Sequence, residues 1–90
     1  MIKSAQIRIT GRVQGVGFRY YSVMKAMEFG ISGYVMNAPD GSVFIEAEAE
    51  EEDLDCFILW CEKGPVSARV DKVDITPGVL KSFKGFGIRH

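Results

Sequence analysis

The chain has 90 residues, of which 47% are hydrophobic and 26% are charged, and its formal net charge is −1. This length suits one small domain with one core, and the composition excludes a disordered chain. The balanced charge argues against a general nucleic-acid binder, which would carry a basic excess. We therefore expect residues 1–90 to form a single domain.

The two cysteines, Cys56 and Cys61, lie in a six-residue apolar run that is far too short to cross a bilayer. A five-residue offset points two side chains to different faces of a helix, so we expect no disulfide between them. Two cysteines cannot complete a tetrahedral zinc site, and the single histidine, His90, is the last residue. The N-terminal residues lack the apolar stretch of a signal peptide. These features predict a cytoplasmic protein with reduced thiols and no structural metal.

The first third of the chain predicts a strand, a loop and a helix. Residues 3–12 alternate between apolar and polar side chains, as in a half-buried strand, and a glycine-rich loop follows. Residues 18–29 indicate a helix that ends at Gly30. Of its two apolar stripes we favour the one whose small residues permit close approach to a sheet: Phe18, Ser22, Ala26 and Phe29. Met24 and Met27 are then partly exposed, and we expect a monomer with at most weak self-contact there.

The middle of the chain predicts a hairpin. Residues 31–38 and 42–50 have strand alternation, and the residues between them, Pro39-Asp40-Gly41, have the conformational preferences of a turn. Acidic residues then open a second helix, where they suit the positive end of the helix dipole. The apolar positions of this helix follow the spacing of a buried stripe: Leu54, Phe57, Ile58 and Cys61.

Gly64-Pro65 ends the second helix, and two further strands follow. In residues 68–76 the alternation shifts phase between Val70 and Val73, which indicates a β-bulge. Residues 83–90 predict a short last strand with Phe86 and Ile88 directed inward. The order βαββαβ plus a terminal edge strand is typical of an α+β ferredoxin-like sandwich, an antiparallel sheet with two helices on one face. We interpret the acidic stretch 46–55 as a solvated strand edge and helix start, not a metal site.

The segment 11–19 joins a strand to a helix N-terminus, where backbone N–H groups lack partners and the helix dipole is positive. Gly15 and Gly17 permit a turned backbone that points consecutive amides inward, and Arg19 can hold two phosphate oxygens with its planar guanidinium. Neither a nucleotide P-loop nor a dinucleotide fingerprint fits this segment. On these residues alone, a glycine-rich connector with an exposed arginine remains the alternative to a phosphate cradle.

This loop, Gly-Arg-Val-Gln-Gly-Val-Gly-Phe-Arg at 11–19, resembles the signature of the acylphosphatase family. A second family motif, Gly-aromatic-Val-any-Asn, is matched by residues 33–37, with Tyr34 in place of the commoner Trp. Residues 39–43 and the later Gly64-Pro65 with 68–70 also look like the family. The resemblance covers nearly the whole chain, and the two motifs occur in the family's order.

The resemblance implies hydrolysis of acyl phosphates to a carboxylate and inorganic phosphate, without a metal or cofactor. Arg19 would hold the phosphoryl group together with the backbone amides of Gly15, Val16, Gly17, Phe18 and Arg19, and Asn37 would position the attacking water. In the family, the bound phosphate itself is thought to accept the proton of the water. The chemistry is consistent, since a carboxylate leaves without a general acid and phosphoryl transfer needs mainly positioning and charge stabilisation.

Three alternatives remain at this point. Judged alone, Asn37 before a Pro-Asp-Gly turn is more often a structural residue. A ferredoxin-like sheet can bind RNA, and Lys84-Gly85-Phe86-Gly87 matches the start of an RNA-recognition octamer, although the following aromatics are missing. A non-catalytic module that binds an anion such as carbamoyl phosphate would keep Arg19 without productive water geometry. We expect a small acyl phosphate as the partner, and neither nucleic acid nor a membrane.

Overall fold

The elements follow the chain in the predicted order βαββαβ plus a short final strand. The computed structural model describes residues 1–90. Its elements are β1 (Ile2–Arg12), α1 (Phe18–Phe29), β2 (Ser32–Asn37), β3 (Val43–Glu50), α2 (Glu51–Lys63), β4 (Arg69–Pro77) and β5 (Phe86–Ile88). Neither helix is long and apolar enough to span a membrane.

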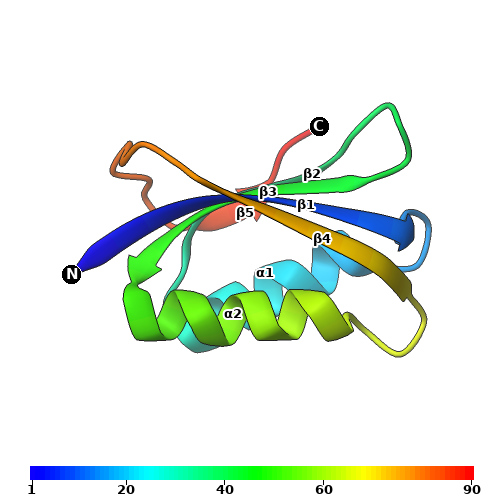
Figure 1. Ribbon diagram of the computed structural model, residues 1–90, viewed down its shortest axis with the longest axis horizontal. Coiled ribbons are helices and arrows are strands. Elements are labelled where there is room, and N and C mark those ends of the chain that lie inside the picture. Colours follow the sequence, from blue (N-terminus) through cyan, green and yellow to red (C-terminus); the bar gives the residue numbers. More distant parts are fainter.

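The five strands form one sheet in the order β4-β1-β3-β2-β5, and both helices cover the same face of it (Figure 1). The pairs β1–β3, β1–β4 and β2–β3 are antiparallel. The predicted ferredoxin-like sandwich is therefore confirmed. The edge strand β5 pairs parallel to β2, so the sheet is mixed rather than wholly antiparallel as expected. Residue alternation shows which face of a strand is buried, but it does not show the direction of its neighbour.

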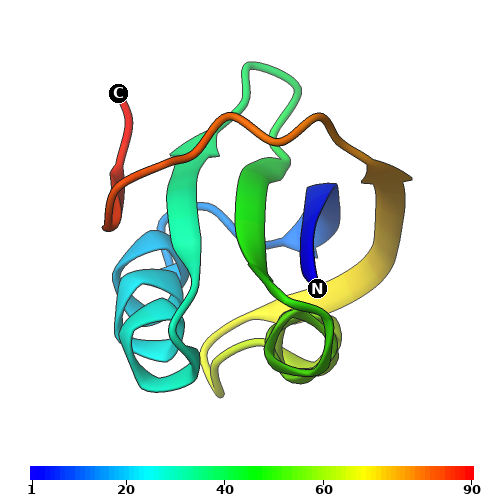
Figure 2. The same ribbon diagram turned by 90° about the vertical axis from the view of Figure 1, so that its left-hand side faces the viewer.

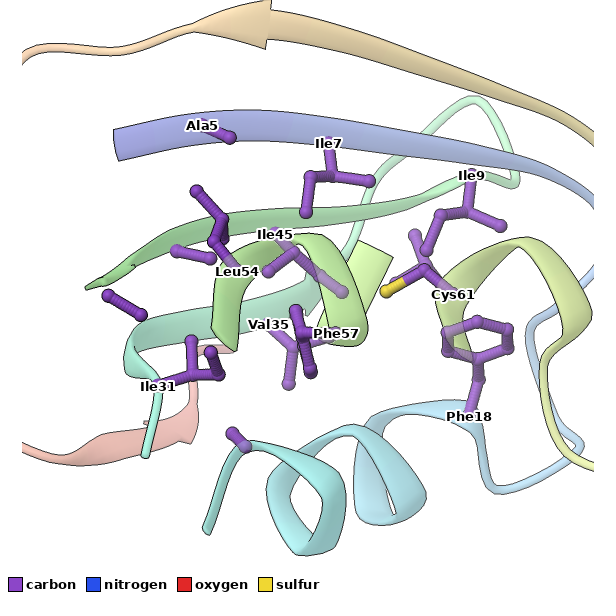
Figure 3. Close-up of a cluster of buried hydrophobic side chains, with 14 of the residues drawn as sticks. Ala5, Ile7, Ile9, Phe18, Ile31, Val35, Ile45, Leu54, Phe57 and Cys61 are labelled. Atoms are coloured by element: carbon purple, nitrogen blue, oxygen red, sulfur yellow. The ribbon is translucent and has the colours of Figure 1, made fainter. Parts of the chain in front are cut away.

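The core lies between the sheet and the helices. Alternate residues of β1 point toward the helices, and Figure 3 shows Ala5, Ile7 and Ile9 above the residues of α1 and α2. The favoured stripe of α1 is confirmed, because Phe18, Ser22 and Ala26 are buried while both methionines of this helix are exposed. The buried Ser22 hydroxyl donates to the Phe18 carbonyl at 2.8 Å, so its burial leaves no unpaired group.

The second helix buries its predicted stripe, except that Ile58 is only half-buried. The Phe57 ring is fully buried and lies 5.9 Å from the Phe86 ring, which joins α2 to the last strand. Cys61 is buried while Cys56 is exposed, and neither is in a disulfide, as the five-residue offset predicted. Burial raises the pKa of the Cys61 thiol and the nearby charge of Glu62 adds to this, so the thiol stays protonated.

The predicted bulge in the fourth strand is confirmed. Val70 pairs with Gly11 and Lys72 with Thr10, which leaves Asp71 as an extra residue between them. The last strand is shorter than expected and only partly inward. Phe86 packs against the core, but Ile88 remains 40% exposed because it lies at the mouth of the pocket described below.

The acidic stretch corrects one sequence prediction. We expected Glu46 and Glu48 on a solvated strand edge, but β3 lies in the centre of the sheet, and these side chains are only 4% and 5% exposed. The connection of residues 78–85 crosses the sheet face opposite the helices on its way to β5 (Figure 2). It covers both carboxylates, and backbone amides of Lys81 and Phe83 donate to Glu48.

Glu46 is the centre of a polar network under this connection. The Tyr34 hydroxyl donates to its carboxylate at 2.6 Å, and Lys81 Nζ does so at 2.9 Å. Burial alone would raise the pKa of Glu46, but these two hydrogen bonds and the charges of Lys81 and Arg89 hold it below its usual value. The pKa of Tyr34 is raised, first by burial and then by its bond to Glu46. The Arg89 guanidinium stacks 3.7 Å from the centre of the Tyr34 ring.

Candidate functional site

The loop between β1 and α1 turns sharply into the helix. Gly15 and Gly17 both have left-handed backbones, with φ of 75° and 82°, and Gly17 is the N-cap of α1. A side chain at either position would strain this conformation. The glycines of the loop are therefore explained by the turn that they make.

The first turn of α1 has no internal partner for its amides. No side chain caps the helix and no acidic residue lies in its first turn. Outside the regular helix and strand ladders, residues 15–20 donate no backbone hydrogen bond, and the first such bond runs from Tyr21 N to Gly17 O at 3.0 Å. Unpaired amides at the positive end of a helix dipole form a site for an anion.

A pocket of about 180 Å³ opens at this loop. Gly15, Gly17, Phe18 and Arg19 line one side of it. Arg19 is half-buried, and its guanidinium takes part in no ion pair or side-chain hydrogen bond within the protein. A positive charge beside uncapped helix amides opposes the helix dipole, so an anion bound there would stabilise both groups.

Asn37 reaches the same pocket from a different part of the sheet. It is the last residue of β2, and its Oδ1 atom is buried without a hydrogen-bond partner. A buried amide oxygen without a partner is costly, so its presence beside Arg19 indicates a ligand or water that donates to it. The structure thus brings together the two side chains that the sequence singled out, across 18 residues of chain.

The side chains of Val16 and Ser42 lie outside the pocket, and for Val16 the prediction concerned the backbone amide and not the side chain. The Val16 side chain packs against the core instead of lining the pocket, and its carbonyl accepts a bond from Ser67 Oγ at 2.6 Å. Ser42 is a turn residue, since its hydroxyl donates to Asp40 at 2.6 Å and accepts from Arg8 at 2.8 Å. The hydrogen bond from the Ser42 hydroxyl, followed by that from its amide, holds the pKa of the Asp40 carboxyl below its usual range.

Sequence reasoning missed the outer rim of the pocket. Tyr20, Ile88 and His90 line this rim, and buried Val13 also lines the pocket. Ile88 was expected in the core, but the parallel pairing of β5 with β2 brings it and the terminal His90 to the same pocket as Asn37. No pattern in the sequence gives the place where a short edge strand docks. The motif alone could have identified Tyr20, because it follows Arg19 directly.

Three other features of the molecule do not offer a comparable site. A larger hollow of about 490 Å³ lies between the helices, beside Tyr21, Lys25, Trp60 and Lys63, and none of the predicted site residues lines it. No three His, Cys, Asp or Glu side chains are placed to hold a metal ion together. The sheet face that an RNA-binding domain of this fold would use is covered by residues 78–85, so the structure does not favour RNA binding.

Comparison with known proteins finds one matching family and several similar solved structures. The family model described as acylphosphatase matches residues 5–88. An acylphosphatase from Mannheimia succiniciproducens is 51% identical over 86 residues, covering 94% of this chain and 96% of the relative. The crystal structure of acylphosphatase from Bacillus subtilis superposes with a TM-score of 0.94 at 35% identity, covering 100% of both chains. A full-length HypF in its phosphate- and nucleotide-bound form has a domain, 12% of its chain, that superposes equally well at 33% identity.

Proposed function

This chain belongs to the acylphosphatase family, and from that premise we propose that it hydrolyses acyl phosphates to a carboxylate and inorganic phosphate. The whole chain, residues 1–90, would act as one domain. One observation carries the proposal for the site: Arg19, the uncapped amides of the β1–α1 loop and the unpartnered Asn37 Oδ1 meet at one pocket. The alternatives of RNA binding and of a non-catalytic anion-binding module have no comparable support.

We assign the binding of the phosphoryl group to the loop and Arg19. The amides of residues 15–19 would donate to its oxygens, and the Arg19 guanidinium would hold two of them with its parallel N–H groups. These donors are fixed before the substrate arrives, so no reorganisation is needed as charge moves during the reaction. They favour a doubly charged oxyanion over the singly charged carboxylate product.

We assign the positioning of water to Asn37. Its Oδ1 atom would accept one O–H of a water molecule, which leaves a lone pair of that water free to face phosphorus. A carboxamide cannot take the proton at neutral pH. As the water oxygen bonds to phosphorus, the proton that the water loses passes to a phosphoryl oxygen, as the family resemblance implied.

The leaving group needs no general acid. The P–O bond to the acyl oxygen breaks with its electron pair on that oxygen, which departs as a carboxylate whose conjugate acid has a pKa of about 4. An acyl phosphate dianion and one water thus give a carboxylate and dihydrogen phosphate, with atoms and charge in balance. The protein supplies position and electrostatic stabilisation, the main requirements of phosphoryl transfer.

The test is release of phosphate from benzoyl phosphate in the presence of a chelator. We expect Arg19→Ala to lower kcat/KM by about 10³-fold or more and to weaken inhibition by phosphate, because it removes a charge from the cradle. Asn37→Ala should lower kcat by about 100-fold while phosphate still binds. Near wild-type turnover in Asn37→Ala would contradict the role of Asn37.

The chain offers matched controls for both variants. Arg12 is exposed at the end of β1, forms no ion pair and lies outside the pocket, so Arg12→Ala should leave turnover unchanged. Gln6 carries the same amide group as Asn37 but makes no side-chain hydrogen bond and does not line the pocket, and Gln6→Ala serves the same purpose. If these controls lost as much activity as the site variants, the losses would come from the change in net charge or from a disturbed fold and not from the pocket.

We further propose that the protein works as a monomer in the cytoplasm. Two unpaired thiols, one of them exposed, suit a reducing compartment. Sedimentation at high concentration tests the monomer, because association through the exposed methionines of α1 would raise the apparent mass.

A further inference from the structure

We propose that Gln14 is a positioning residue, which sets the distance between the phosphate cradle and Asn37. The inference rests on the proposed function of the site. It concerns a residue that lies outside the pocket, so it touches neither the phosphoryl group nor the water. Its effect on the reaction would pass through the backbone on either side of it.

The Gln14 side chain joins two segments that are distant in sequence. Its Nε2 atom donates to the Ala38 carbonyl at 2.8 Å and to the Ser42 carbonyl at 2.9 Å. Gln14 directly precedes Gly15, the first residue of the cradle, and Ala38 directly follows Asn37. These are the only hydrogen bonds between residues 13–19 and residues 37–42.

The two carbonyls are at the base of the turn between β2 and β3. Ala38 N donates to Ser42 O at 2.8 Å, and Gly41 N donates to Ala38 O at 3.1 Å. The turn is therefore already closed by its own backbone hydrogen bonds, and Gln14 Nε2 donates two further hydrogen bonds to its carbonyl oxygens. Its bonds hold the base of the turn against the loop, rather than forming the turn.

The sheet does not make this connection by another route. The loop follows β1 and Asn37 ends β2, but β3 lies between these two strands. Arg8 also holds the turn, through Ser42 Oγ and Asp40, but it does so from β1 and makes no hydrogen bond or ion pair with the loop. Gln14 is thus the polar contact that sets where the loop lies relative to the turn.

The geometry of the reaction makes this distance important. A water held by Asn37 must lie in line with the phosphorus held by the loop, and a displacement of about 1 Å costs about 100-fold in rate. The amides and Arg19 stay together on their own loop when Gln14 is changed, so they should still bind phosphate. The expected signature is a loss of kcat with phosphate affinity kept.

The test compares Gln14→Met with the same change at Gln6. Methionine keeps the length and lack of branching of glutamine but donates no hydrogen bond. We expect Gln14→Met to lower kcat for benzoyl phosphate by about tenfold or more and to change the dissociation constant of inorganic phosphate by less than about threefold. Gln6→Met should leave both unchanged. Arg8→Ala, which loosens the turn without touching the loop, should lower kcat by less than Gln14→Met.

Three results would overturn the inference. These are unchanged kcat in Gln14→Met, equal losses of kcat and phosphate affinity, or an equal loss of kcat in Arg8→Ala. If Gln14→Met does not fold, Gln14→Ala and Gln14→Glu allow the same comparison, with circular dichroism as the check on folding. A wild-type protein that releases no phosphate from benzoyl phosphate would instead contradict the proposed function. In that case, the role of Gln14 is still testable by adding phosphate to the wild type and to Gln14→Met. If Gln14 positions the loop relative to Asn37, phosphate should shift the amide signals of residues 15–19 in both proteins but the side-chain signal of Asn37 only in the wild type.

Discussion

Replacing Glu46 with Gln removes one charge from the network under the connection to β5 while keeping the shape of the side chain. The Tyr34 hydroxyl then donates to a neutral oxygen in place of a carboxylate, which weakens that bond by about 1 kcal/mol. Lys81 loses its ionic partner, but its side chain is 49% exposed, so this pair contributes at most about 1 kcal/mol. Burying the carboxylate of Glu46 is itself costly, and the substitution removes this cost. The net decrease in the free energy of unfolding is therefore about 1 kcal/mol.

The direction of the pKa shift gives the pH dependence of this loss. Because the folded protein lowers the pKa of Glu46, its contribution is fully present above the unfolded pKa of about 4.5 and is lost as the pH falls through the lower folded value. Urea unfolding of the wild type and Glu46→Gln should therefore differ by about 1 kcal/mol at neutral pH, or about 4–8 °C in Tm. The gap should start to narrow as the pH falls below about 4.5 and should close once the pH is below the lowered pKa of folded Glu46.

A gap that stays constant from neutral to acid pH would refute this reasoning. Glu62→Gln is the matched control, because Glu62 is exposed on α2 and forms neither a hydrogen bond nor an ion pair. It should show little difference from the wild type at any of these pH values. The comparison matters for the site, since the connection held by Glu46 delivers Ile88 and His90 to the pocket.

Three further outcomes follow from packing and backbone geometry. Phe57→Ala should lower the free energy of unfolding by about 3–5 kcal/mol in urea, because it removes a fully buried ring. A thiol reagent should modify one cysteine per native chain, exposed Cys56, and both in urea, because burial and a raised pKa protect Cys61. Gly15→Ala has open space around its added methyl group but keeps an unfavourable φ, so it should lower stability by about 1–2 kcal/mol and weaken phosphate binding in a titration.

Local patterns in the sequence predicted the helices and strands well, because each pattern indicates which side chains are buried in the core. The alternation of residues 3–12, the small residues of α1 and the phase shift at Val70 all reflect which side chains meet the core. The loop at 11–19 was also predictable from local sequence. A left-handed backbone favours glycine, and an arginine at the start of a helix opposes the helix dipole unless an anion binds there.

The parts that the sequence did not predict depend on contacts between distant segments. Glu46 and Glu48 alternate as surface residues would, and only the path of residues 78–85 across the sheet buries them. The direction of β5 and the place of Ile88 depend on where that path ends. The two bonds of Gln14 likewise need the loop and the turn to meet, which no local pattern shows.

The central claim is that the backbone amides of the loop, with Arg19, hold a phosphoryl group beside Asn37. A titration with inorganic phosphate, followed residue by residue through the amide signals of the ¹⁵N-labelled protein, tests it most directly. Our account predicts saturable shifts concentrated at residues 15–20 and at the Asn37 side chain, with the loop shifts weakened in Arg19→Ala. Shifts concentrated at the hollow between the helices, near Lys25 and Lys63, or no saturable shifts at the loop, would contradict it.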